Sequence, residues 1–180
     1  METKTFGDKK ITIRMATKSD LKNVKKFQVF INSLVEEEAK LLMNKKATLK
    51  EEKEFLERML KGVKDKTKIY LVAECDNKII GATDIELERW RRNHIGKLGI
   101  TIIQGYRGMG LGKHLMSEAI KLVKKELSPR PKIIQLEVYI NNKPAIVLYK
   151  KMGFKVVAKL PKQIQWKEKL IGELVMIKFL

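Results

Sequence analysis

The chain of 180 residues has little cysteine, little histidine and no long apolar run, and each shortage excludes a class of protein. A single cysteine, Cys75, cannot form an internal disulfide, and its place just after the apolar run 69–73 indicates a buried, unreactive thiol. The two histidines, His94 and His114, lie far apart with no cysteine beside them. Zinc therefore has no evident ligand set, and we expect no metal site.

No segment approaches the roughly 20 continuous apolar residues of a membrane-spanning helix, and residues 1–10 are too charged for a signal peptide. We therefore expect a cytoplasmic protein with no membrane partner. Apolar residues make up 44% of the chain, which is enough for one sizeable core. The length predicts a single domain over residues 1–180.

Acidic residues are outnumbered, because 21 Asp and Glu face 39 Lys and Arg and leave a formal net charge of +18. Such a surplus can serve a nucleic-acid ligand or an acidic partner. The lysines, however, occur on nearly every polar helix face, and no aromatic residues interleave with them as a base-stacking surface requires. We therefore expect no nucleic-acid partner, and heat adaptation would explain the same composition. The densest basic segment, Arg89 to Arg92 around Trp90, is either a solvated loop or an aid to binding an anion.

Glycine is concentrated in one motif, where an apolar strand-like run ending at Ile103 gives way to Arg-Gly-Met-Gly-Leu-Gly-Lys over residues 107–113. Glycines at alternate positions let successive backbone N–H groups converge, and the N-terminus of the helix that follows attracts anions. A Walker A loop would need glycine in place of Arg107 and Ser or Thr in place of His114. A dinucleotide-binding fingerprint would need glycine in place of Lys113. The motif therefore predicts a phosphate-binding loop of another kind, Arg-x-x-Gly-x-Gly.

Periodicity, turn signals and helix caps predict the order strand, two helices, three strands, helix, strand, helix, two strands. The expected strands are residues 11–15, 68–74, 78–87, 97–103, 133–140, 154–158 and 173–179. The expected helices are 21–34 with Ser19 or Asp20 as N-cap, 48–63 with a Thr48–Glu51 capping box, 111–127, and a short one from Asn142 to Gly153.

A second block of motifs follows the glycine loop: Leu136-Glu137-Val138, then Asn142 to Tyr149, then Gly153-Phe154. Together, in this order and spacing, the two blocks resemble the GNAT family of N-acetyltransferases over residues 79–154. The resemblance implies an α/β fold of the α+β type. Its central sheet would be mixed, mostly antiparallel and seven-stranded, flanked by four helices and splayed between strands 4 and 5.

The resemblance also implies a cofactor, acetyl-CoA. Backbone groups of Ile100, Thr101 and Ile102 would pair with its pantetheine arm, and an N–H near Ile102 would polarise the acetyl carbonyl. Asn142 would also meet the arm. The residues expected to hold the pyrophosphate are Arg107, Gly108, Met109, Gly110, Leu111, Gly112 and Lys113.

The same resemblance assigns two catalytic residues. Tyr149 would lie beside the cofactor's sulfur, and as a phenol protonated at neutral pH it can donate a proton to the departing thiolate. Glu137 matches the general base of the branch that acetylates ribosomal-protein N-termini. Glu86, Glu88 or water are the alternatives for the base.

The expected reaction is direct attack by a primary amine, on a small amine, an amino acid or a peptide or protein N-terminus. A polyamine or protein-lysine acceptor is the alternative, followed by a non-catalytic coenzyme A sensor and a nucleic-acid-binding module. In this family the acceptor enters between residues 32–46 and 160–172. There, Glu36 to Glu38 either hold a cation or form a solvated face in which Glu36 pairs with Lys40. The oligomeric state, a homodimer included, is left open.

Overall fold

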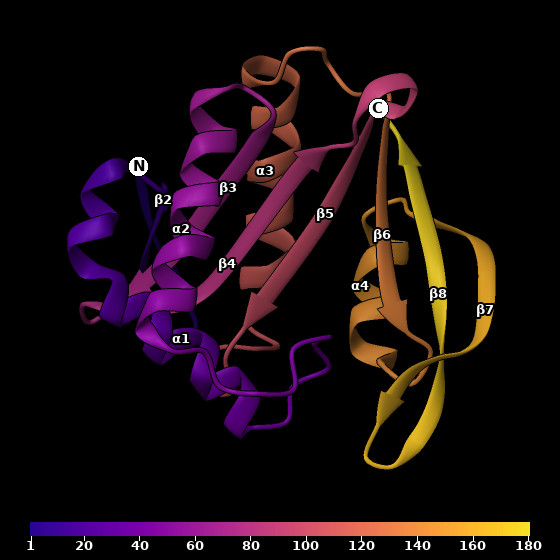
Figure 1. The fold of residues 1–180 in the computed structure, drawn as a ribbon, viewed down its shortest axis with the longest axis horizontal. Coiled ribbons are helices and arrows are strands. Elements are labelled where there is room, and N and C mark those ends of the chain that lie inside the picture. Colours follow the sequence, from indigo (N-terminus) through magenta and orange to yellow (C-terminus); the bar gives the residue numbers. More distant parts are fainter.

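An eight-stranded sheet forms the centre of the computed structural model, which describes all 180 residues, and helices cover both of its faces (Figure 1). The strands are β1 (Glu2–Phe6), β2 (Lys9–Met15), β3 (Lys68–Cys75), β4 (Lys78–Leu87), β5 (Ile95–Ile102), β6 (Ile133–Tyr139), β7 (Lys155–Trp166) and β8 (Lys169–Phe179). The helices are α1 (Val24–Glu36), α2 (Leu49–Lys64), α3 (Leu111–Glu126) and α4 (Lys143–Lys151), with 3₁₀ turns at Lys18–Asn23 and Trp90–Arg92. The spatial order of the strands is β1-β2-β3-β4-β5-β6-β8-β7.

The sheet has one strand more than the seven predicted, because residues 2–6 form β1 and pair with β2 in a hairpin. This strand is short and polar, with only Phe6 buried, so it lacks the apolar alternation by which the other strands were found. Gly7 makes the turn with a φ of +61°, in the left-handed region that favours glycine. The rest of the predicted order is confirmed.

Two predicted boundaries were wrong. Neither Ser19 nor Asp20 is the N-cap of the first helix: α1 begins after Asn23, and Thr17 caps the 3₁₀ turn that precedes it, where the Thr17 N–H donates to the Asp20 carboxylate at 2.8 Å. The last hairpin is also longer than expected, because β7 and β8 continue past their buried segments to the turn at Lys167 and Glu168. Those outer residues are mostly exposed and carry no periodic apolar signal.

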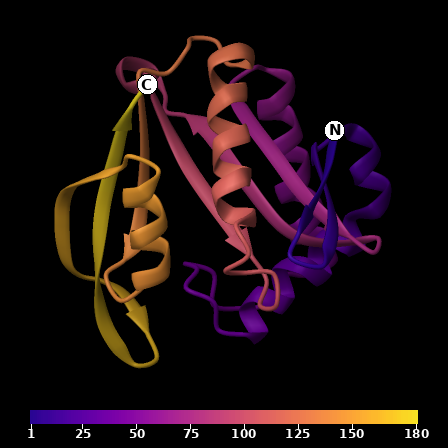
Figure 2. The ribbon, with the colours of Figure 1, turned by 180° about the vertical axis from the view of Figure 1, so that it is seen from behind.

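Each face of the sheet has its own apolar core. Helices α1 and α2 cover one face, where Phe27, Leu34 and Leu56 pack against Tyr70 and Val72. Helices α3 and α4 cover the other, as the reverse view shows (Figure 2). Cys75 is buried as expected. None of the helices has the length and apolarity needed to cross a membrane.

The predicted splay lies between β5 and β6, the only parallel neighbours in the sheet. Their pairing is limited to three residue pairs, from Ile95↔Ile133 to Lys97↔Gln135. Beyond Lys97 the strands diverge (Figure 1), and β5 keeps hydrogen bonding only toward β4. The edge of β5 from Leu98 to Ile102 that faces β6 is therefore free of strand partners, and we call the space beside it the gap.

Candidate active site

The glycine loop connects the end of β5 to the start of α3 at the lower end of the gap. Gly108 and Gly110 have φ angles of +80° and +90°, and a Cβ placed on either would meet no atom within 4 Å. The backbone conformation therefore favours glycine at both positions. Because neither residue has a side chain, the peptide groups of the loop stay open beside the N-terminus of α3. Gly112 differs, because a Cβ there would lie 3.3 Å from Leu148 Cδ2 and 3.4 Å from Ile102 Cδ1. Close packing of α3 against α4 and β5 explains that glycine.

The side chain of Arg107 is committed to the protein rather than to the open surface of the loop. Its Nε donates to the Ile102 carbonyl at 2.6 Å, and its guanidinium forms an ion pair with Glu37. The Glu37 carboxylate also accepts the Gln104 N–H at 2.8 Å. Glu37 thus fastens the C-terminal end of α1 to the glycine loop. The sequence showed three consecutive glutamates here but not that the middle one turns inward.

Ile100, Thr101 and Ile102 lie on the unpaired stretch of β5, as predicted, with their other side paired to Thr83, Ala82 and Gly81 of β4. A ligand with amide groups can therefore pair with this edge as a further strand would. Across the gap, Asn141 Oδ1 is buried and has no hydrogen-bond partner. Asn142 occupies the N-cap position of α4, but its side chain makes no capping hydrogen bond. These free polar groups, with the glycine loop, fit the arm and pyrophosphate of coenzyme A.

Tyr149 lies on α4, behind β6, with its side chain almost fully buried against Phe154 at a ring-centroid distance of 6.2 Å. Burial raises the pKa of its phenol to about 12, because the charged phenolate would lose its hydration. The phenol is therefore protonated at neutral pH, as a proton donor must be.

Glu137 lies on β6 and faces the side of the sheet covered by α1 and α2, opposite to Tyr149. Its carboxylate forms an ion pair with Lys97 on β5 and accepts a hydrogen bond from Gln135 Nε2 at 3.3 Å. Glu173 on β8 lies nearby, and its pKa is raised by burial and by the charge of Glu137. Glu137 is thus part of a polar cluster on the face of the sheet that α1 and α2 cover.

The two alternative bases have other partners. Glu86 pairs with the buried Lys68 at 2.7 Å, and Glu88 pairs with Arg92 at 3.5 Å. Glu88 and the basic segment Arg89 to Arg92 lie at the start of β5, about 23 Å along the strand from the glycine loop at the rate of about 3.3 Å per residue. The basic segment therefore does not assist phosphate binding at that loop.

Two acidic residues that sequence reasoning missed lie on the same face. Asp84 on β4 is half-buried, and burial raises its pKa to about 6. Glu52 in the first turn of α2 is only 5% exposed, and burial raises its pKa to about 7. A signal was available for Glu52, because it occupies an inward position in the periodic pattern of Leu56 and Met59.

The two segments expected to admit the acceptor are adjacent in the fold. Glu38 pairs with Lys167, Lys40 lies 5.4 Å from the centroid of the Trp166 ring, and the Tyr139 hydroxyl donates to the Leu41 carbonyl at 2.5 Å. The predicted pair of Glu36 with Lys40 was wrong. Glu36 binds Lys46 at 2.6 Å instead, because the chain after α1 folds back rather than continuing the helix.

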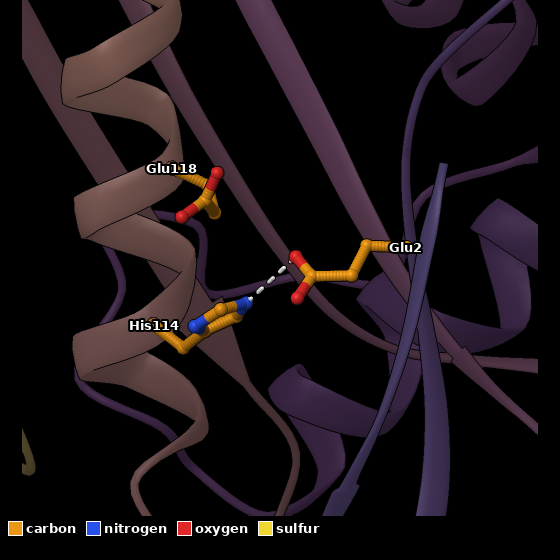
Figure 3. Close-up of side chains that lie close together, drawn as sticks. All are labelled: Glu2, His114 and Glu118. Atoms are coloured by element: carbon orange, nitrogen blue, oxygen red, sulfur yellow. Dashed lines mark hydrogen bonds and ion pairs between the residues drawn. The ribbon is translucent and has the colours of Figure 1, made fainter.

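His114, expected to be isolated, has two carboxylates beside it. Figure 3 shows Glu118 on the next turn of α3 and Glu2 reaching across from β1, with potential ligand atoms within 4.8 Å of one another. His114 Nε2 lies 3.2 Å from the Glu2 carboxylate, and Glu118 binds Lys121 at 2.7 Å. The contact between Glu2 and His114 holds β1 against α3.

Comparison with known proteins agrees with this geometry. The model of the acetyltransferase (GNAT) family matches residues 32–154. The L-amino acid N-acetyltransferase AaaT of Escherichia coli is 36% identical over 87 residues, which are 48% of this chain and 52% of that protein. An N-alpha-acetyltransferase of Sulfurisphaera tokodaii is 32% identical over 98 residues, 49% of this chain and 57% of that protein. The chain therefore spans little more than half the length of these relatives.

Among solved structures, a GNAT-family acetyltransferase from Streptococcus pneumoniae superposes with a TM-score of 0.81 at 27% identity. The match covers 94% of this chain and 99% of that one.

Proposed function

Because the chain belongs to the acetyltransferase (GNAT) family, we propose that it transfers an acetyl group to the α-amino group of an amino acid or of a protein N-terminus. Acetyl-CoA is the acetyl donor of this family. One observation carries the assignment: the glycine loop directly follows the unpaired edge of β5 beside the gap, and Tyr149, with its protonated phenol, lies on the helix that follows β6, the strand on the other side of the gap. The names of the two relatives support the class of acceptor.

The chain offers a distinct set of groups for each part of the cofactor. Backbone N–H groups of residues 108–113 would hold the pyrophosphate, and the free edge of Ile100 to Ile102 would pair with the amides of the arm. When bound, acetyl-CoA supplies a thioester carbonyl that an amine can attack. An N–H of β5 near Ile102 would stabilise the charge that develops on the carbonyl oxygen, at little reorganisation cost because the strand is already fixed.

Tyr149 and Glu137 would handle the two protons, because they lie on opposite faces of the sheet, so that one can serve the sulfur and the other the acceptor. The Tyr149 hydroxyl would donate to the sulfur as negative charge develops there. Glu137, or water next to it, would take the proton from the acceptor's nitrogen. An α-amine with a pKa near 8 is about one-tenth neutral at pH 7, so this second task is modest.

The direct test is incubation of the purified protein with acetyl-CoA and a panel of acceptors, followed by thiol release. The panel contains alanine, alaninamide, a short peptide with a free N-terminus, the same peptide with an acetylated N-terminus, and spermidine. We expect turnover of the α-amines and none of the blocked peptide. Absence of thiol release with every acceptor would contradict the proposed function, and a preference for spermidine would favour the polyamine alternative.

A further inference from the structure

Glu52 is a buried carboxylate to which the protein supplies no partner. It is 95% shielded from solvent, yet it forms no hydrogen bond and no ion pair in a chain that contains 39 Lys and Arg. Its position in the first turn of α2 favours negative charge, but burial is the stronger effect. The Glu52 oxygens are not completely enclosed, because Asn141 Oδ1 is the only fully enclosed polar side-chain atom without a partner.

Asp84 provides a second carboxylate without a hydrogen bond on the same face of the sheet. It lies opposite Gly99 of β5, and a Cβ on Gly99 would stand 2.8 Å from Asp84 Oδ1. Gly99 is itself exposed, so no side chain closes the surface above Asp84 on the side nearest the gap. The nearest cation, Lys68, is already paired with Glu86.

Tyr70 links the two carboxylates in space. It pairs with Asp84 across β3 and β4, and its ring lies under Phe55, which follows Glu52 by one turn of α2. Burial raises the pKa of its phenol, and the charges of Glu52 and Asp84 raise the pKa further. Asp20 has a smaller effect on the pKa of Tyr70, and its carboxylate forms an ion pair with Arg14 at 2.7 Å. A line of acidic groups thus runs from the start of α2 across the sheet to the edge of the gap.

We propose that Glu52 and Asp84 select an acceptor that carries an ammonium group and no carboxylate beside it, such as a peptide N-terminus rather than a free amino acid. This inference rests on the proposed function and narrows its acceptor. A free amino acid would bring its own carboxylate toward the buried Glu52 and the half-buried Asp84, and like charges repel more strongly where burial limits screening by water. In a peptide the same carbon belongs to a neutral amide.

The experiment compares kcat/KM for alaninamide and alanine in the wild-type protein and in Glu52→Gln. The two amines differ in basicity and so in intrinsic reactivity. For each acceptor we therefore take the ratio of kcat/KM in the variant to kcat/KM in the wild type, in which the intrinsic reactivity cancels. We expect Glu52→Gln to lower kcat/KM about tenfold for alaninamide, mainly through KM, and to leave alanine unchanged or improved. Glu54→Gln is the control, since Glu54 is exposed on the same helix and should change neither acceptor.

Asp84→Asn provides a second, independent variant should Glu52→Gln fold poorly, and it should move the two acceptors in the same directions. Binding is checked without turnover, as the shift in melting temperature that alaninamide produces when coenzyme A is present. Equal effects of the substitutions on both acceptors, or a loss confined to alanine, would overturn the inference while leaving the acetyltransferase function intact. Failure of the function itself would appear as no turnover by the wild-type protein.

Discussion

At the scale of single residues, the chemistry depends on side chains whose surroundings differ from water. Tyr149 is the clearest case, because burial keeps its phenol protonated well above neutral pH. Tyr149→Phe removes one hydroxyl and almost no volume, so packing and coenzyme A affinity should change little. Loss of a positioned donor should lower kcat by about 10²- to 10⁴-fold. Steady-state kinetics on a thioester with a more acidic leaving thiol should recover part of the loss, and retention of more than about half of kcat would exclude Tyr149 as the donor.

The buried Glu52 predicts a pH dependence of folding. Its pKa is about 7 in the folded chain against an ordinary value of 4.5, so the folded state keeps this proton longer than the unfolded state. Stability from this group is complete below about pH 4.5 and is lost as pH rises through 7. Glu52→Gln should therefore match the wild type near pH 4 and exceed it by something on the order of 3 kcal/mol above pH 8. Denaturant melts at both pH values measure this, and a gain independent of pH would refute it.

At the scale of elements, the glycine loop joins β5 to α3 and should hold the pyrophosphate. Gly110→Val forces a β-branched residue into a φ of +90°, which should distort the loop and abolish thermal stabilisation by coenzyme A. The wild type should gain about 2.7 kcal/mol at a hundredfold excess over Kd. Gly7→Val is the matched control, because Gly7 also has positive φ but lies in the β1–β2 turn. An unchanged shift in Gly110→Val would place the pyrophosphate elsewhere.

The contact between the end of α1 and the glycine loop should affect the affinity for coenzyme A. Glu37 holds both Arg107 and the Gln104 N–H, so Glu37→Gln should loosen the loop and raise the Kd for coenzyme A by roughly three- to tenfold. Isothermal titration measures this, with Glu36→Gln as control because Glu36 pairs only with the exposed Lys46. Tighter binding by Glu37→Gln would mean that a released Arg107 binds phosphate itself.

At the scale of the whole molecule, the positive charge and the acidic face act in opposite directions. The net charge of +18 attracts polyanions such as coenzyme A to the protein as a whole. The face beneath α1 and α2, in contrast, carries the unpaired carboxylates of Glu52 and Asp84, and Glu137 and Glu173 lie on the same face of β6 and β8. The molecule thus offers each of the two proposed substrates a surface of opposite charge.

The sequence by itself determined the features that depend on neighbouring residues. Positive φ angles at Gly108 and Gly110, the Thr48 cap of α2 and the apolar stripe of α3 are local, so the loop and the helices after it could be predicted. The order of the two motif blocks was sufficient to indicate the family, and the roles that it assigns to Tyr149 and Glu137 stay predictions. The polar strand β1 was not predicted, because residues 2–6 have no apolar alternation and form a strand only through pairing with β2.

Only the tertiary structure decided how distant polar groups are paired. Glu37 meets Arg107 across 70 residues, and Glu36 binds Lys46 instead of Lys40, because the chain after α1 folds back over the gap. The Asp84 carboxylate fits beside β5 because Gly99, on a different strand, has no side chain there to collide with it. The burial and the pairing of a side chain depend on residues that only folding brings next to it. No local pattern could therefore show that Glu52 and Asp84 lack a partner.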